Sequence, residues 1–190
     1  KEDFKDNSFE IISTDIVGPA VGKDLRFRAV IAILLSLVGI GLYVSYRFEP
    51  KFAVGGIVAL LHDALVSVGA LAITGREISL PVLAALLTVI GYSINDTIVI
   101  FDRIRENMKL KAKSDFASLI DHSINQTLSR TFLTSFTVFL VLLALYFLGG
   151  EVINDFAFVM LIGVITGTYS TIFIAAPIIV DWPGKKKKRG

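Results

Sequence analysis

Five stretches of the chain are apolar on every face and long enough to cross a lipid bilayer. A helix rises about 1.5 Å per residue, so a hydrocarbon core of about 30 Å needs about 20 mainly apolar residues. The pattern predicts spans at residues 27–46, 52–73, 80–101, 131–149 and 153–180, and Pro177 is expected to bend or end the last helix. The predicted fold class is therefore an all-α membrane protein, a bundle of about five transmembrane helices.

The composition supports lipid as the solvent of this chain. Its 190 residues are 54% hydrophobic, and the mean hydropathy is +0.70. Soluble domains are only about 45–50% apolar, because they need a polar surface. A soluble core would have to bury five consecutive helices that are apolar all round, which a domain of this size cannot do.

The connector between the third and fourth spans carries a different, one-sided pattern. Apolar residues recur there at helical spacing, and polar residues occupy the opposite face. The apolar set is Phe116, Leu119, Ile120, Ile124 and Leu128, and the polar set is Asp115, Ser118, Asp121, His122, Asn125 and Gln126. This predicts an amphipathic helix over 114–129 that lies at the cytoplasmic membrane surface, although a helix packed on a neighbouring protein would show the same pattern.

Lys and Arg in the loops predict the orientation, because cytoplasmic loops are rich in cations. The segments 47–51, 102–130 and 185–189 fall on one side of the membrane and hold most of the cations, whereas the turns 75–79 and 150–155 hold one Arg between them. The C-terminus is therefore expected in the cytoplasm, in a bacterial-type cytoplasmic membrane, with residue 1 on the extracytoplasmic side. The basic tail 183–190 is expected to bind anionic lipid of the bilayer, and no basic domain or aromatic platform around it suggests nucleic-acid binding.

The segment before the first span does not open like the start of a protein. Residue 1 is Lys, and no charged-then-apolar leader follows it. We therefore expect residues 1–26 to be the end of a truncated extracytoplasmic domain, with a closing strand at 8–17. A further span upstream would bring the intact protein to six.

Several classes of chemistry are excluded by the residues that are present. The chain has no cysteine and two histidines, which rules out thiolate chemistry and makes a metal site improbable. It contains no phosphate-binding loop and no nucleophile motif. No enzymatic activity and no cofactor are expected, so any work must draw on an outside energy source such as a proton gradient.

Asp96, in the third predicted span, is the strongest candidate for that role. A charge at the centre of a membrane helix costs about 2.5–3.5 kcal/mol on insertion scales, so its presence needs a reason. Burial favours the protonated form of a carboxyl group and a nearby cation favours the ionised form, so Asp96 could exchange a proton with Arg130 as its movable partner. Asn95 and Thr134 are further candidates for this proton relay. The alternative is a permanent ion pair, or a carboxylate that Ser and Thr hydroxyls hold in place.

His62 and Asp63, near the middle of the second span, form a weaker candidate for the relay. Neighbouring side chains diverge by about 100° on a helix, so we expect the two residues not to form one unit. A neutral His62 bonded to another helix would explain the histidine. Asp63 is either a relay group or a polar packing site.

Small residues in the last span indicate close helix packing. Gly163 and Gly167 form a GxxxG motif, which is common where membrane helices approach one another. The motif carries little information about function.

Several motifs resemble the SecD/SecF protein-export membrane family, and they extend over nearly the whole chain. The longest is GYSINDTIVIFDRIREN at residues 91–107. The others are IVGPAVGKDL at 16–25, ALLHDALVSVG at 59–69, TLSRT at 127–131 and LIGVITGTYSTIFIA at 161–175. The variant NDTIVIFDRIREN is more similar to SecF than to SecD, and a fused SecDF is possible.

The resemblance implies a fold and a function. SecF belongs to the resistance–nodulation–division superfamily, and its six spans pair with six from SecD beside the SecYEG channel. The complex uses the proton-motive force to assist the translocating polypeptide. In that family the residues that match Asp96 and Arg130 are implicated in proton conduction.

Two other functions remain open at the level of the sequence. The chain could be half of another proton-driven exporter of the same superfamily, moving lipids or drugs. It could also be a scaffold that stabilises the channel without transporting anything.

Overall fold

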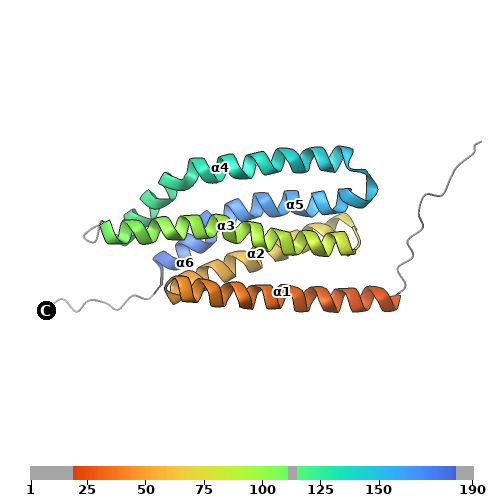
Figure 1. Ribbon diagram of the computed structural model, residues 1–190, viewed down its shortest axis with the longest axis horizontal. Coiled ribbons are helices and arrows are strands. Elements are labelled where there is room, and N and C mark those ends of the chain that lie inside the picture. Colours follow the sequence, from red (N-terminus) through yellow and green to blue (C-terminus); the bar gives the residue numbers. More distant parts are fainter. Residues whose placement is uncertain (1–18, 111–114, 183–190) are drawn as a thin grey trace, which may run out of the picture.

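Successive long helices run back and forth along one axis, joined by short turns (Figure 1). The computed structural model describes residues 19–110 and 115–182. Its elements are α1 (Pro19–Arg47), α2 (Pro50–Thr74), α3 (Leu80–Leu110), α4 (Phe116–Leu148), α5 (Gly150–Ser170), the π-helical turn η1 (Thr171–Ala175) and α6 (Ala176–Val180). Because α5, η1 and α6 follow one another without a break, they form one span. The predicted all-α bundle of five apolar helices is confirmed.

The helix α3 is the centre of the bundle and packs against α1, α2, α4, α5 and η1. Half of the most apolar stretch of α3 is buried, whereas only 17% of the corresponding stretch of α4 is buried. Around α3 lie two apolar clusters, one that includes Phe52, Phe101 and Ile179 and another that includes Leu71 and Val159. On α2 and on the last span, buried polar residues lie between the two clusters. The interior of the bundle therefore has a polar layer between two apolar ones.

Pro177 neither ends nor sharply breaks the last span. Its ring removes one backbone donor and crowds the carbonyl four residues earlier, which an ordinary helical turn cannot accommodate. Immediately before α6 the chain forms η1, a wider π-helical turn. Single turns of this kind occur inside α-helices. Gly55 of α2 lies against this turn, where a Cβ atom would sit 2.9 Å from the carbonyl oxygen of Ala175.

The predicted surface helix over 114–129 is not a separate element. Residues 116–148 form the single helix α4, which begins with Asp115 accepting a hydrogen bond from the Ser118 amide at 3.2 Å. Leu119 and Ile120 are buried in the core of this chain, because α3 continues to Leu110 and covers them. Intramolecular packing therefore produced the amphipathic pattern that we assigned to a membrane surface.

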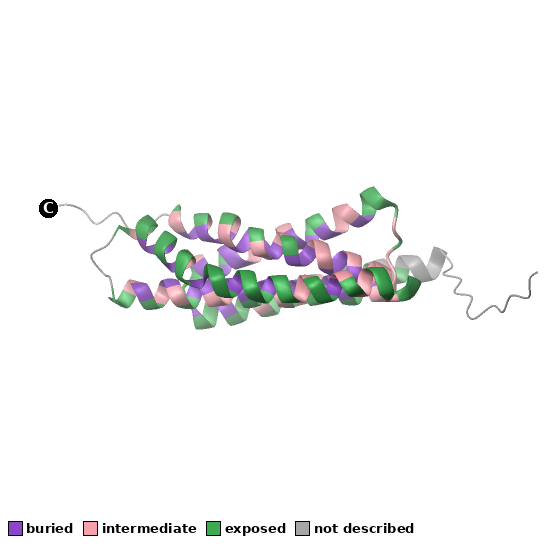
Figure 2. Cartoon of the chain, turned by 90° about the horizontal axis from the view of Figure 1, so that it is seen from above, coloured by how far each residue is buried: buried purple, intermediate pink, exposed green. Residues whose placement is uncertain are grey.

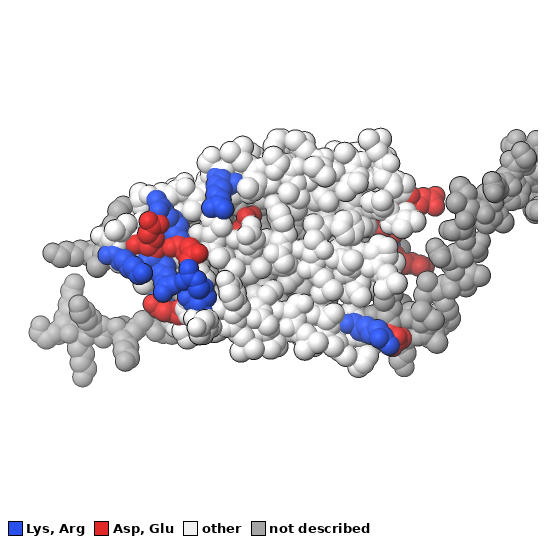
Figure 3. All heavy atoms as spheres, viewed as in Figure 1, with Lys and Arg blue, Asp and Glu red and all other residues white. Residues whose placement is uncertain are grey.

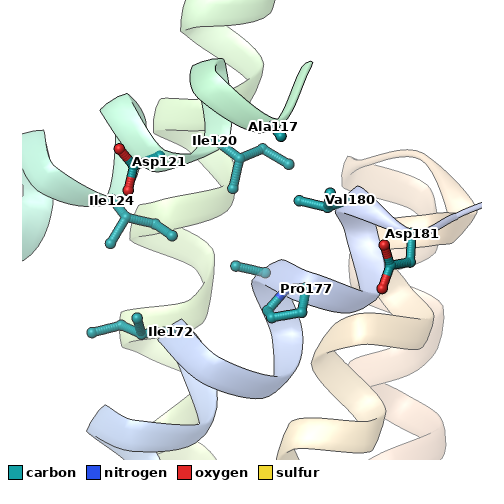
Figure 4. A pocket seen from close by; sticks show the side chains of 9 residues that line it. Ala117, Ile120, Asp121, Ile124, Ile172, Pro177, Val180 and Asp181 are labelled. Carbon is teal, nitrogen blue, oxygen red and sulfur yellow. The ribbon is translucent and has the colours of Figure 1, made fainter. Parts of the chain in front are cut away.

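Beside this part of α4, the bundle has an open apolar depression. Figure 4 shows Ile120 and Ile124 of α4 on one side, with Ile172, Pro177 and Val180 of the last span on the other. The depression marks where the first half of α4 and α6 diverge.

The outward faces of the helices are apolar, as expected for a multi-pass membrane protein. Exposed residues follow the outer sides of the helices in Figure 2. On α1 and α4 these residues include Leu35, Leu42, Val141 and Phe147, each more than half exposed. Such a surface would be unfavourable in water and is favourable against acyl chains or other helices.

Charged side chains gather at the ends of the bundle (Figure 3). We call the end formed by the α1–α2 turn, the α3–α4 connection and the end of α6 the basic end, because it carries Arg47, Lys51, Arg103, Arg105 and Lys109. At the opposite end Arg76 donates to Asn154 at 2.8 Å and pairs with Asp155, and its guanidinium lies 4.5 Å from the centre of the Phe158 ring. Arg76 thus ties the α2–α3 turn to the start of α5.

Some predicted segments lie outside the described residues, namely the strand at 8–17 and the basic tail 183–190. We expected residues 1–26 to be the end of an external domain, but residues 19–26 belong to α1. The helix therefore begins before the first span, whose apolar part lies at Phe27–Arg47, close to the predicted 27–46.

Replacing Gly163 by alanine should destabilise the bundle. The added Cβ would overlap the side chain of Val89, whose own Cβ would be 2.9 Å away, so α5 would have to move off α3. Overpacking of this kind lowers the free energy of unfolding by about 1–3 kcal/mol, to be measured by reversible unfolding in mixed micelles. Gly69→Ala is the matched control, because nothing lies within 4 Å of its added Cβ. Equal losses in both variants would contradict the close-packing account.

Candidate functional site

A layer of buried polar side chains crosses the bundle between its two apolar clusters. It draws on α2, α3, α4 and the last span. Its members are Asp63 and Ser67, Ser93, Asp96 and Thr97, Ser135, and Ser170 and Thr171. No group of three or more His, Cys, Asp or Glu side chains able to hold a metal occurs in residues 19–110 and 115–182.

Asp63 is fully buried and joins three helices. Its Oδ2 atom accepts hydrogen bonds from the hydroxyls of Ser93 on α3, at 2.5 Å, and of Ser170 on α5, at 2.8 Å. Next to it, the hydroxyls of Thr97 and Thr171 are 2.9 Å apart and bond to each other. The carboxyl group is thus held entirely by neutral donors on its Oδ2 side.

His62 and Asp63 do form one unit, so our expectation that they would not is wrong. The Nδ1 atom of His62 lies 3.0 Å from Oδ1 of Asp63. Their Cβ directions diverge, but both side chains are long enough to meet along the helix surface. The His62 side chain is 31% exposed, and its ring lies 6.0 Å from that of Tyr169 on α5. His62 therefore connects a buried carboxyl group to the outside of the bundle.

Asp96 is 5% exposed and faces α4 and α5. Ser135 of α4 donates a hydrogen bond to its Oδ2 atom at 3.2 Å, and Thr168 of α5 donates to the Ser135 hydroxyl at 3.0 Å. Thr168 also lies 3.0 Å from the carbonyl oxygen of Val164. A chain of hydroxyl groups therefore leads from the carboxyl group to a backbone acceptor.

Arg130 lies nearer the basic end than Asp96, on the same side of α3. It lines a shallow depression together with Val99 and Asp102, which follow Asp96 along one face of α3. Since Ser135 is opposite Asp96, Arg130 is about 7–8 Å away along the helix axis. Among the described residues no ion pair within 4.0 Å includes Arg130. The structure therefore brings the two residues near each other without a permanent bridge.

The other candidates for the relay lie outside this core. Asn95 is exposed, because one residue along a helix turns the side chain away by about 100°. Thr134 is exposed too, and its hydroxyl donates to the carbonyls of Arg130 and Thr131 in its own helix. Both face whatever surrounds the bundle.

The GxxxG motif sets the distance between α5 and α3 at this layer. A Cβ atom on Gly167 would lie 3.1 Å from the hydroxyl oxygen of Ser93, and Gly163 packs on Val89. The close approach allows Ser170 of α5 and Ser93 of α3 to reach the same oxygen of Asp63. The glycines are thus part of how the site is built.

Sequence reasoning missed Ser93, which bonds to Asp63, and also Thr97 and Thr168, which bond to other hydroxyls of the layer. A hydroxyl in a membrane helix is inexpensive, because it can donate to its own backbone, so it gives little signal alone. The available signal was position, since Ser93 and Thr97 flank Asp96 within one helical turn on either side.

Comparison with known proteins agrees with this geometry. The family described as "Protein export membrane protein SecD/SecF, C-terminal" matches residues 1–185. The chain belongs to the SecD/SecF family. The resemblance found from the motifs is thereby confirmed.

Relatives and solved structures of the family are closely similar. A protein translocase subunit SecF from Koribacter versatilis is 48% identical over 189 residues, which is 98% of this chain and 47% of the relative. A SecF from Desulfurispirillum indicum is 50% identical, over 93% of this chain and 57% of the relative. The crystal structure of SecDF, a translocon-associated membrane protein from Thermus thermophilus, superimposes with a TM-score of 0.82 and 51% identity, over 87% of this chain and 23% of that one. The chain spans about half the length of these SecF relatives.

Removing the Ser93 hydroxyl should weaken the polar layer measurably. Hydrogen bonds between membrane helices contribute about 0.6 kcal/mol on average and at most about 1.7. Ser93→Ala should lower the free energy of unfolding by an amount in that range, measured in mixed micelles. The control is Ser36→Ala, whose lost hydroxyl donates only to Ala32 of its own helix. A loss in Ser36→Ala as large as that in Ser93→Ala would refute an interhelical role for Ser93.

Proposed function

We propose that this chain is the membrane part of a SecF-type subunit that uses the proton-motive force to assist protein translocation. Its partners would be SecD, the SecYEG channel and the translocating polypeptide, in a bacterial cytoplasmic membrane with the basic end facing the cytoplasm. Protons are the coupling ion, and no enzymatic step is involved. The names of the relatives support the export role, and the surroundings of Asp96 support the proton-driven part.

The observation that carries the proposal is that the partners of Asp96 suit both of its protonation states. When Asp96 is ionised, Thr168 donates to Ser135 and Ser135 donates to the carboxylate. When Asp96 is protonated, it can donate to Ser135, Ser135 to Thr168, and Thr168 to the carbonyl of Val164. Ser135 and Thr168 therefore each keep an acceptor in both states, and neither hydroxyl incurs the cost of about 1–3 kcal/mol of an unpaired buried group.

Arg130 supplies the second half of the switch. A long arginine side chain can cover much of the axial distance to Asp96, and its approach favours the ionised carboxylate. Between them on α4, the Thr131 hydroxyl is buried and lacks a partner among the described residues, so it offers a polar contact on that path. Protonation of Asp96 weakens this attraction and releases Arg130 toward the basic end.

The proton gradient is large enough to drive such a movement. One charge that crosses 100 mV releases about 2.3 kcal/mol, and each pH unit of gradient adds about 1.4 kcal/mol. A single proton thus shifts a two-state equilibrium by more than tenfold. The movement of α3 against α4 would pass to the domain outside the membrane.

Replacing Asp96 by asparagine should abolish gradient-driven export and leave the complex assembled. Asparagine keeps the shape and can bond to Ser135, but it carries no exchangeable proton. The measurement is polypeptide translocation into proteoliposomes that hold the intact complex, with and without an imposed proton gradient. The gradient-dependent part of the rate should fall to the level seen without a gradient.

The matched control is Asp102→Asn, which removes an exposed carboxylate from the same helix, where it pairs with Arg47 at 3.3 Å. That variant should keep its gradient dependence. Export by Asp96→Asn at the rate of the unmodified complex would refute the proposal. A scaffold would be indicated if Asp96→Asn failed to assemble and the unmodified complex carried no proton flux. Proton flux that drives drug or lipid efflux instead of secretion would show a different exporter.

A further inference from the structure

The carboxyl group of Asp63 has no fixed cation beside it in the described part of the chain. From α3 it faces Ser93, with Asp96 one turn away, and from the last span it faces Ser170, with Thr171 next to it. On α2 its neighbours are His62 and, one turn on, the buried Ser67. An ionised carboxylate in these surroundings would be costly unless His62 carried the compensating charge.

The partners of Asp63 can serve both of its protonation states. Ser170 lies 2.8 Å from Oδ2 of Asp63 and 3.2 Å from the carbonyl oxygen of Gly167. With Asp63 ionised, Ser170 donates to the carboxylate. With Asp63 protonated on Oδ1, the acid donates to Nδ1 of the neutral His62, and Ser170 continues to donate to Oδ2.

His62 provides the route by which a proton reaches Asp63. Its Nδ1 atom points inward to Oδ1 of Asp63, and the side chain is 31% exposed at the bundle surface between α2 and α5. The Nε2 atom has no hydrogen-bond partner within residues 19–110 and 115–182. Histidine changes charge in the physiological pH range, so it can take up and pass on protons there.

We propose that His62 and Asp63 form a second proton-exchange site, separate from Asp96 and Arg130. A proton enters at Nε2 of His62 and makes the imidazolium. The Nδ1–H bond then breaks as the Oδ1–H bond of Asp63 forms, which leaves a neutral histidine and a neutral acid. The reverse transfer releases the proton at the surface, so atoms and charge balance in each direction.

This site does not depend on the proposed export function. It shares α3 and α5 with the Asp96 site, because Ser93 lies three residues before Asp96 and Ser170 two residues after Thr168. Each proton event changes hydrogen bonds on both helices. The two carboxyl groups therefore act on the same pair of helices from opposite sides.

Infrared difference spectroscopy of the intact protein in liposomes tests the proposal. A protonated carboxyl group gives a carbonyl band that shifts in D₂O, and this band should appear as the pH is lowered from about 8 to 5. One band should disappear in Asp63→Asn and another in Asp96→Asn. Asp63→Glu should keep the titration and move the band, which identifies it even if Asp63→Asn folds poorly.

Two further variants make the test specific. His62→Gln can still donate to Asp63 but cannot carry a proton, so the Asp63 band should no longer titrate in this range. Thr74→Ala removes a hydroxyl from the far end of the same helix, where it bonds only to Ala70 and Leu71 of that helix, and should leave the band unchanged. The proposal is overturned if the Asp63 band is constant over the whole range, or if it titrates in His62→Gln as in the unmodified protein. Because no export is measured, failure of the export proposal would not produce either result.

Discussion

The two buried carboxyl groups of this bundle need partners within the protein, because no bulk water reaches the middle of a membrane. That requirement shapes the site more than any other interaction. Asp63 accepts from hydroxyls on two other helices, whereas Asp96 accepts from Ser135, which in turn accepts from Thr168. Ser170 and Thr168 also have backbone carbonyls as second acceptors. Hydroxyl groups are suited to this task because they both donate and accept. A fixed cation in their place would favour the ionised state and resist the protonated one.

The packing of small residues makes this arrangement possible. The glycines of α5 let it approach α3 closely enough for side chains as short as serine to meet across the interface. Near the same level, the last span widens into a π-turn in which Thr171 bonds to Thr97. Loosely packed helices would have left gaps that a side chain as short as serine could not span.

The surface of the bundle divides by chemistry. Its sides are apolar, above all on α1 and α4, whereas its ends are charged and aromatic. At one end Arg76 bonds to the start of α5, and at the other Arg47 pairs with Asp102. Apolar sides of this kind are favourable against lipid or other helices.

The sequence by itself determined the number of helices, the membrane as solvent, the family and the prominence of Asp96. These follow from composition, from long apolar runs and from motifs, which are local properties of the chain. Tertiary structure alone decided that residues 116–129 pack on α3 and continue into α4, and that His62 reaches Asp63. It also decided that Asn95 points outward while Ser93 and Ser170 converge on one carboxyl oxygen. Periodicity shows that a helix has two unlike faces, but what covers each face depends on contacts between residues far apart in the chain.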